Sequence, residues 1–225
     1  QIGNKTRAVV VIETLDLAPP REKEVLVKIG AAGICHSDWH IRTGGTEHPL
    51  PAAVGHEGAG VVETLGEGVT SLRQGDHVAL SWAPGCDSCF YCSDRRPALC
   101  ETWKEALWAG TLLDGTTRLS LDGRPVYHYC ALACFAEYAV VPEACCVPVD
   151  KEVPLEVAAL IGCAVTTGLG ASMNTVKVEE GASVVIYGMG GVGLSILAGA
   201  RLAGAAPLIC VDLWEEKLEL ARSFG

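Results

Sequence analysis

The feature that most limits the fold is a glycine-rich turn, YGMGGVG, at residues 187–193. It follows a strand-like run at residues 182–187 and opens a helix-like stretch at residues 190–204. Gly188, Gly190 and Gly193 have the G-x-G-x-x-G spacing. This spacing allows a tight turn and lets a pyrophosphate approach the helix N-terminus, where the helix dipole favours negative charge. The turn therefore predicts a strand–turn–helix unit of a parallel α/β sheet.

The next strand-like run, residues 207–212, ends in an acid that fits the same interpretation. Asp212 lies nineteen residues after Gly193, close to the roughly 20-residue spacing at which a carboxylate accepts ribose hydroxyls. An acid there repels a 2′-phosphate, and Leu213 follows it without a neighbouring arginine. The pattern favours NAD over NADP. The alternative is a purely structural turn in which Asp212 caps the following helix.

Before this unit the chain has a different pattern, with short β-rich runs separated by Gly, Pro and Asp turns. These runs predict strands at Val9–Ile12, Val25–Ile29, Gly60–Leu65, His77–Ser81 and Glu137–Val141. A helix is expected from Pro154 in the stretch DKEVPLEVAALIG. The sequence thus predicts α+β and α/β architecture, in which a barrel-like β region precedes the start of an α/β sheet.

Charge and hydropathy exclude several classes of partner. With 17 Lys and Arg against 27 Asp and Glu, the net charge of -10 would repel nucleic acid and anionic lipid. The first thirty residues lack the layout of a signal peptide, and no uninterrupted apolar run approaches the roughly 20 residues that span a bilayer. We expect a cytoplasmic protein, whose eleven cysteines are metal ligands or catalytic thiols more often than disulfides.

Four of these cysteines occur within fifteen residues, in CDSCFYCSDRRPALC at residues 86–100. Thiolates at every third position can converge on one tetrahedral ion, and four of them fill its coordination sphere. Structural zinc is the favoured interpretation, and an iron–sulfur cluster or unliganded buried thiols are the alternatives. A filled site leaves no position for substrate, so it would stabilise a loop. The predicted ligands are Cys86, Cys89, Cys92 and Cys100.

An open site needs other ligands, and three candidates are dispersed along the chain. Cys35 lies in AGICHSDWH, His56 precedes Glu57 in VGHEGAG, and Cys163 lies in LIGCAVTTG. Two thiolates and one imidazole form a known catalytic zinc set with an open fourth position. Spacing alone does not single out these three, since any buried Cys or His has a simpler structural explanation.

Taken together in this order, these motifs resemble the zinc-containing medium-chain alcohol dehydrogenase family. The shared elements are GICHSDWH, GHEGAGVV, the four-cysteine lobe, the cysteine before TTG, and the glycine turn with its acid. The resemblance implies that Cys35, His56 and Cys163 hold a catalytic zinc, and that the cysteine lobe holds a structural zinc. It also implies a GroES-like catalytic domain at residues 1–160, with the lobe at 84–102, and an incomplete Rossmann domain at 161–225. We therefore expect the chain to be a fragment or to be incompletely traced.

The resemblance assigns further roles around the catalytic zinc. Glu57 would lie behind the metal, and Asp38 would orient the imidazole of His56. A proton would pass from Ser37 toward His40, whose unperturbed pKa of roughly 6.5 suits exchange with solvent. The simpler alternatives are that Ser37 is a turn residue and His40 an exposed polar residue.

Other residues would contact cofactor or substrate. His36 would face the pyrophosphate, Lys217 would approach the adenosine ribose, and Gly191 belongs to the glycine turn. Val192 and Thr167 would lie near the nicotinamide. Trp82 and Tyr129 would line the substrate pocket. Each of these has an ordinary alternative as a surface or packing residue.

The implied activity is hydride transfer between a primary or secondary alcohol and NAD, giving an aldehyde or ketone, in a homodimer or homotetramer with two zinc ions per complete chain. One alternative is oxidation of a thiol adduct of formaldehyde. Another is a non-catalytic redox sensor that binds zinc and a dinucleotide. A third is an interaction module in which Arg95 and Arg96 of the cysteine lobe contact another macromolecule.

Overall fold

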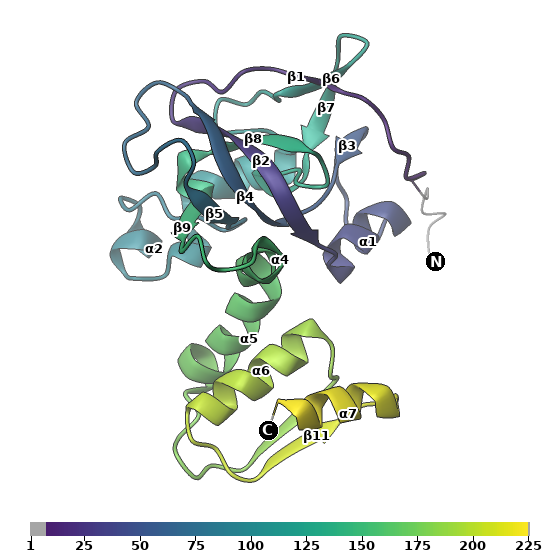
Figure 1. Cartoon of the computed structure of the whole chain (residues 1–225), viewed down its shortest axis with the longest axis vertical. Helices are drawn as coiled ribbons and strands as arrows, with labels where there is room; N and C mark the ends of the chain where they lie inside the picture. The colour runs from purple at the N-terminus through teal and green to yellow at the C-terminus, as the bar shows by residue number, and fades with distance from the viewer. Residues whose placement is uncertain (1–7, 225) are drawn as a thin grey trace. The chain divides into compact units, whose positions relative to one another are not determined.

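The computed structural model describes residues 8–224 of the chain, which divides into two compact units between Gly162 and Cys163 (Figure 1). The predicted domain boundary at residue 160 lies near this division. That the second unit is an incomplete dinucleotide-binding domain stays a prediction. The helices are α1 (His36–Thr43), α2 (Phe90–Ser93), α3 (Glu101–Ala109), α4 (Leu155–Leu160), α5 (Thr166–Gly170), α6 (Gly191–Leu202) and α7 (Glu215–Ser223).

The first unit is built on a five-stranded antiparallel sheet. Its spatial order is β8 (Tyr138–Pro142), β2 (Glu24–Gly33), β4 (Glu57–Leu65), β5 (His77–Leu80) and β9 (Cys146–Val149). In β2, Val25 and Val27 are fully buried, which is the period-2 alternation of a strand with one face in a core. Four of the five predicted strands are confirmed here.

A second sheet in this unit joins short segments that sequence patterning does not predict. Its order is β1 (Asp16–Leu17), β6 (Leu119–Leu121), β7 (Arg124–His128) and β3 (Ala52–Ala53). The predicted strand Val9–Ile12 is wrong, because this segment forms no strand and its side chains are 63–102% exposed. Its β-branched residues favour extended backbone, but no neighbouring strand pairs with it in the described part of the chain.

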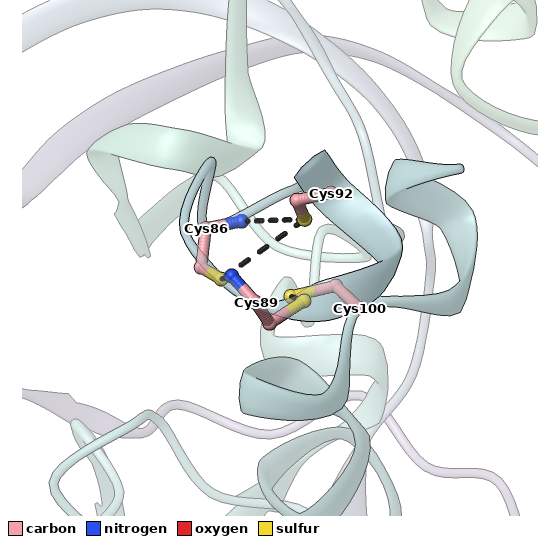
Figure 2. A group of neighbouring side chains, drawn as sticks. All are labelled: Cys86, Cys89, Cys92 and Cys100. Carbon is pink, nitrogen blue, oxygen red and sulfur yellow. Dashed lines mark hydrogen bonds between the residues drawn. The ribbon is translucent and has the colours of Figure 1, made fainter. Parts of the chain in front are cut away.

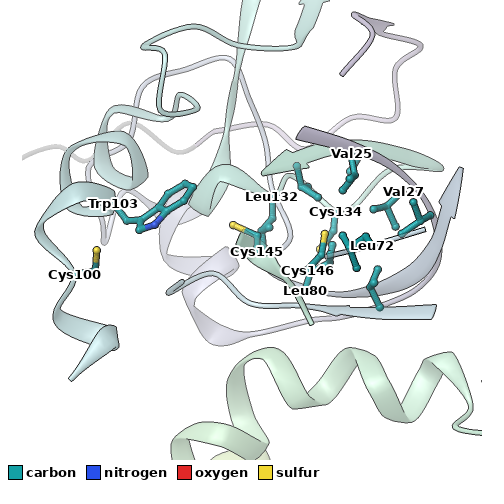
Figure 3. Close-up of a cluster of buried hydrophobic side chains, with 14 residues drawn as sticks. Val25, Val27, Leu72, Leu80, Cys100, Trp103, Leu132, Cys134, Cys145 and Cys146 are labelled. Carbon is teal, nitrogen blue, oxygen red and sulfur yellow. The ribbon is translucent and has the colours of Figure 1, made fainter. Parts of the chain in front are cut away.

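The main core lies on the five-stranded sheet and reaches toward the cysteine lobe (Figure 3). Val25, Val27 and Leu80 come from the sheet, and Trp103 comes from α3. Cys100 ends the lobe and is buried with Trp103 in the same cluster. The lobe is therefore attached to the core through its last cysteine and the helix that follows it.

A buried ion pair joins the two sheets of the first unit. Arg118, just before β6, has a fully buried side chain and donates two hydrogen bonds to Glu24 at the start of β2, at 2.8 and 2.5 Å. It also contacts Asp114 at 2.7 Å. Bidentate geometry is the arrangement in which a buried arginine is best compensated for its lost hydration.

The second unit has the strand–helix–strand order predicted from the glycine turn, followed by a second helix. β10 (Val184–Tyr187) pairs in parallel with β11 (Leu208–Val211), while α6 and α7 follow the two strands. At Gly193 an added Cβ would lie 1.8 Å from the carbonyl oxygen of Gly188. Glycine is thus required where α6 starts, as the spacing of the motif predicts.

One helical run, Leu155–Val176, comprises α4, α5 and two π-helical segments, Ile161–Val165 and Ala171–Val176. Its 22 residues are long and apolar enough to cross a membrane by length and composition. The sequence of this stretch is not an uninterrupted apolar run, as expected, because Thr166, Thr167 and Ser172 interrupt it, but they do not interrupt the helix. In the first unit, Ala158 and Ala159 of α4 are buried in one cluster with Ala59 of β4 and Ala79 of β5. A core helix passes the same test, so one such helix is a weak indication of a membrane span.

Candidate metal and cofactor sites

The cysteine lobe brings four sulfur atoms together (Figure 2). The Sγ atoms of Cys86 and Cys92 are 4.0 Å apart, those of Cys89 and Cys100 are 3.9 Å apart, and all four lie within 4.8 Å of one another. Zinc–sulfur bonds of about 2.3 Å fit a tetrahedron of this size. All four thiols are free. The predicted structural zinc ligands therefore converge on one point.

Hydrogen bonds within the lobe favour the thiolate form of Cys86 and Cys89. Side-chain hydrogen bonds from Thr102 and Ser88 lower the pKa of Cys86 to about 5. Desolvation by contrast raises the pKa of Cys92 to about 11. In the metal-free lobe these thiols do not all ionise together, and a dication is what would hold all of them as thiolates.

A second donor set forms where two elements of the first unit meet. Cys35 is the N-cap of α1, and His56 is the residue before β4. Their ligand atoms, with a carboxylate oxygen of Glu57 and the Sγ of Cys163, all lie within 4.8 Å of one another. Cys163 directly follows Gly162, where an added Cβ would lie 2.1 Å from the carbonyl oxygen of Leu80. The donors of this set are far apart in the sequence, so sequence spacing alone does not reveal that they form one group.

The carboxylate of Asp38 forms hydrogen bonds to two residues of this second donor set. It is buried, and its two oxygens accept hydrogen bonds from the N–H groups of Cys35 at 3.0 Å and Gly55 at 3.0 Å, and from His56 Nδ1 at 3.2 Å. Because Nδ1 donates to a carboxylate, Nε2 keeps its lone pair for a metal. Burial alone would lower the pKa of His56, but Asp38 and Cys35 raise it overall. The donor types and the oriented imidazole fit a zinc ion.

Aromatic rings border the imidazole. Tyr129 meets His56 edge to face with ring centres 5.4 Å apart, and Trp82 does so at 6.5 Å. Tyr129 is buried, and this desolvation raises the pKa of its hydroxyl above the usual range. The two predicted pocket residues thus lie beside the metal ligand, where they would exclude water. Their roles toward substrate stay predictions.

Helix α1 carries the residues predicted to move a proton. Ser37 lies at its first turn, with Oγ accepting a hydrogen bond from the Cys35 thiol at 3.6 Å. His36 and His40 are exposed, and their ring centres are 5.2 Å apart. The path from the donor set through Ser37 to solvent-exposed His40 is therefore compatible with the fold and remains a prediction.

In the second unit, the glycine turn has the properties of a phosphate site. An added Cβ at Gly188 or Gly190 would meet nothing within 4 Å, and Gly190 caps α6 without a side chain. Asp212 Oδ2 accepts the Met189 N–H at 2.7 Å, so the acid braces the turn. Backbone hydrogen bonds from Met189 and Trp214 lower the pKa of Asp212. These residues fit a dinucleotide whose pyrophosphate lies on the helix N-terminus.

The remaining predicted cofactor residues also lie in the second unit. Lys217 on α7 has its Nζ 3.8 Å from Asp212. Val192 and Gly191 begin α6, and Thr167 lies in α5; all three are exposed. Their contacts with a cofactor stay predictions.

Sequence reasoning missed an open pocket of about 650 Å³ in the first unit. It is lined by Thr46, Glu47, His48, Pro49 and Trp108. The His48 ring meets the Tyr129 ring edge to face at 5.4 Å. Nothing in the loop sequence GTEHP signals this contact, because it depends on how the loop packs on a distant segment.

Together, these features define a class of protein. A β-rich unit with an open thiolate–imidazole donor set and a separate closed four-thiolate lobe, followed by a glycine-turn βαβ unit, is the arrangement of a zinc-dependent dehydrogenase. The family model of the alcohol dehydrogenase GroES-like domain matches residues 21–151. The chain belongs to the zinc-containing medium-chain alcohol dehydrogenase family, which confirms the resemblance inferred from the motifs.

Individual relatives agree with this membership. The chain is 41% identical over 217 residues to alcohol dehydrogenase class-3 of Drosophila melanogaster, covering 96% of this chain and 57% of the relative. It is 44% identical over 215 residues to S-(hydroxymethyl)glutathione dehydrogenase of Escherichia coli, covering 95% and 58%. Benzyl alcohol dehydrogenase of Acinetobacter calcoaceticus is a structural match with TM-score 0.86 and 40% identity, covering 94% and 57%. The chain thus spans a little over half the length of these relatives.

Proposed function

We propose that this chain carries the zinc site of an NAD-dependent oxidoreductase that interconverts an alcohol and its aldehyde or ketone. The observation that supports this most strongly is the dispersed donor set. Cys35, His56 and Cys163 are brought within 4.8 Å, while the four-cysteine lobe is complete without them. A zinc ion bound there would supply a Lewis acid that lowers the pKa of a coordinated hydroxyl group.

The chain's own residues would prepare this chemistry. Asp38 holds the imidazole of His56 in the tautomer that leaves Nε2 free. Trp82 and Tyr129 exclude water from one side of the site. Ser37 would accept the proton of the alcohol and transfer it toward His40, which exchanges it with solvent. Asp212 would select NAD through the ribose hydroxyls.

For the substrate, we propose a thiol adduct of formaldehyde, which loses a hydride and a proton to give an S-formyl thioester, ahead of simple alcohols. The support is the name S-(hydroxymethyl)glutathione dehydrogenase carried by a 44% identical relative. A neutral aromatic alcohol is the second candidate. Its support is the benzyl alcohol dehydrogenase match and the aromatic rings beside His56. A homodimer or homotetramer and a cytoplasmic location complete the proposal.

The test is the formation of NADH, followed by absorbance, from S-(hydroxymethyl)glutathione, benzyl alcohol and ethanol. The zinc-loaded protein should oxidise the glutathione adduct with the highest kcat/KM, and Cys163→Ala should abolish turnover. Cys210→Ala is the matched control, since this partly buried thiol in β11 belongs to neither donor set. Activity that survives in Cys163→Ala would overturn the catalytic assignment. Turnover of none of the three alcohols would favour a non-catalytic redox sensor.

A further inference from the structure

Two histidines lie one turn apart on the exposed face of α1. His36 and His40 are both exposed, and their ring centres are 5.2 Å apart with the ring planes at 74°. Among residues 8–224, neither ring makes a hydrogen bond or an ion pair. Their four ring nitrogens are therefore available to a ligand.

The spacing suits chelation of one cation. Residues at i and i+4 of a helix are neighbours with Cβ atoms about 5–6 Å apart. With nitrogen–metal bonds of about 2 Å, two imidazoles on one ion have ring centres roughly 5 Å apart, which matches the observed separation. Because both side chains are exposed, their χ2 torsions can turn one nitrogen of each ring toward the same point.

The surroundings of the two rings offer them no competing partner. An added Cβ at Gly45 would lie 3.4 Å from His40, so the turn after α1 packs against the base of that side chain. The Arg42 guanidinium lies 4.4 Å over the Trp39 ring. Asp38, the acid on this helix, is buried and occupied by its three donors. Within residues 8–224 no carboxylate pairs with the two histidines, and the Arg42 guanidinium contacts the Trp39 ring instead.

We propose that His36 and His40 form a two-imidazole site for a divalent transition metal, separate from both zinc sites. Imidazole ligands select Ni²⁺, Cu²⁺ and Zn²⁺ over Mg²⁺ and Ca²⁺. Two protein ligands leave the other positions to water, so the ion exchanges readily, in contrast to an ion held by four thiolates.

A metal bound at this site would inhibit turnover, an inference that rests on the proposed function. A metal bound to His40 would prevent that ring from passing a proton to solvent, and a metal bound to His36 would keep that ring from the pyrophosphate. Excess transition metal would then inhibit turnover without displacing either zinc ion, and chelation of the excess would restore it.

The test is a calorimetric titration of the zinc-loaded protein with Ni²⁺, with zinc content measured on the same samples. We expect one Ni²⁺ per chain at this site, and His36→Gln and His40→Gln should each weaken binding at least tenfold. His77→Gln, on β5, is the matched control and should bind Ni²⁺ as the unchanged protein does. Ni²⁺ should also raise the melting temperature of the unchanged protein and not that of His40→Gln, because a ligand that binds only the folded state stabilises it.

An affinity for Ni²⁺ that is equal in all four proteins, or no Ni²⁺ binding at all, would overturn the proposal. Measuring NADH formation with and without Ni²⁺ distinguishes failure of this inference from failure of the proposed function. If no alcohol is oxidised while Ni²⁺ still binds in a His36- and His40-dependent manner, the function fails and the metal site stands. If NADH formation is unaffected by saturating Ni²⁺, the inhibitory role is wrong.

Discussion

Replacing Asp38 with Asn tests whether this buried carboxylate organises the catalytic metal ligands. The side chain keeps its size. In the unchanged protein, three N–H groups donate hydrogen bonds to the two carboxylate oxygens of Asp38, at 3.0, 3.0 and 3.2 Å. Asn offers one carbonyl oxygen and a donor amide, so at least one N–H loses its acceptor. A buried donor without a partner costs about 1–3 kcal/mol, and hydrogen bonds to a charged group contribute about 1.5–3 kcal/mol. We expect the free energy of unfolding to fall by about 2–4 kcal/mol.

The same substitution should weaken zinc binding at one site only. The imidazole of His56 loses the carboxylate that fixes its tautomer, and loss of such a partner typically costs 10–100-fold in metal affinity. Competition with a chromogenic chelator should show one zinc ion bound 10–100-fold more weakly and the cysteine-lobe ion unchanged. Urea unfolding measures the stability.

Asp76→Asn is the matched control for this experiment. Asp76 accepts one exposed backbone hydrogen bond from Arg73 at 2.8 Å, which the carbonyl oxygen of Asn can retain. If Asp38→Asn and Asp76→Asn have the same stability and the same zinc affinities, Asp38 does not orient the zinc ligands.

Three further predictions concern parts of the fold outside the zinc sites. Gly193→Ala should unfold the second unit and abolish NAD binding, because its Cβ would lie 1.8 Å from a carbonyl oxygen, whereas Gly190→Ala should leave stability nearly unchanged; thermal melts and NAD titration distinguish them. Arg118→Met should cost about 3–5 kcal/mol in urea unfolding, because it leaves a buried carboxylate unpaired, while loss of the exposed Arg222 ion pair should have little effect. Burial lowers the pKa of His128 to about 4, so the folded state binds fewer protons than the unfolded state between pH 6.5 and 4. Stability should fall by roughly 2–3 kcal/mol as the pH drops through that window, and His128→Gln should flatten the dependence measured by urea unfolding at several pH values.

The elements that could be predicted from sequence are those whose signal is local. Alternating burial in β2 and the glycine turn before α6 depend on residues within one short segment, and both appear as expected. Val9–Ile12 shows the limit of local signals, because β-branched residues form a strand only where another strand supplies hydrogen-bond partners. The second sheet was missed for the same reason, since β1 and β3 are two residues long and owe their conformation to pairing.

The two metal sites differ in the same way. The spacing of the cysteine lobe alone predicts a metal site, because all its candidate ligands come from one loop. The ligand atoms of Cys35, His56 and Cys163 lie within 4.8 Å of one another although the three residues are far apart in the sequence, and only the family resemblance connected them in advance. His48, which contacts Tyr129, had no signal, because its role depends on a loop that folds onto a distant part of the chain.

The zinc content of the protein shows whether one chain holds two zinc ions in separate sites. Metal analysis of the purified protein should give two zinc ions per chain, one each for Cys35→Ser and Cys89→Ser, and two for the control Cys210→Ser. Loss of one zinc ion in Cys35→Ser assigns that ion to the dispersed donor set. Loss of one zinc ion in Cys89→Ser assigns the other ion to the cysteine lobe. Two zinc ions retained in Cys35→Ser, or only one in the unchanged protein, would show that the dispersed donor set does not hold a zinc ion of its own.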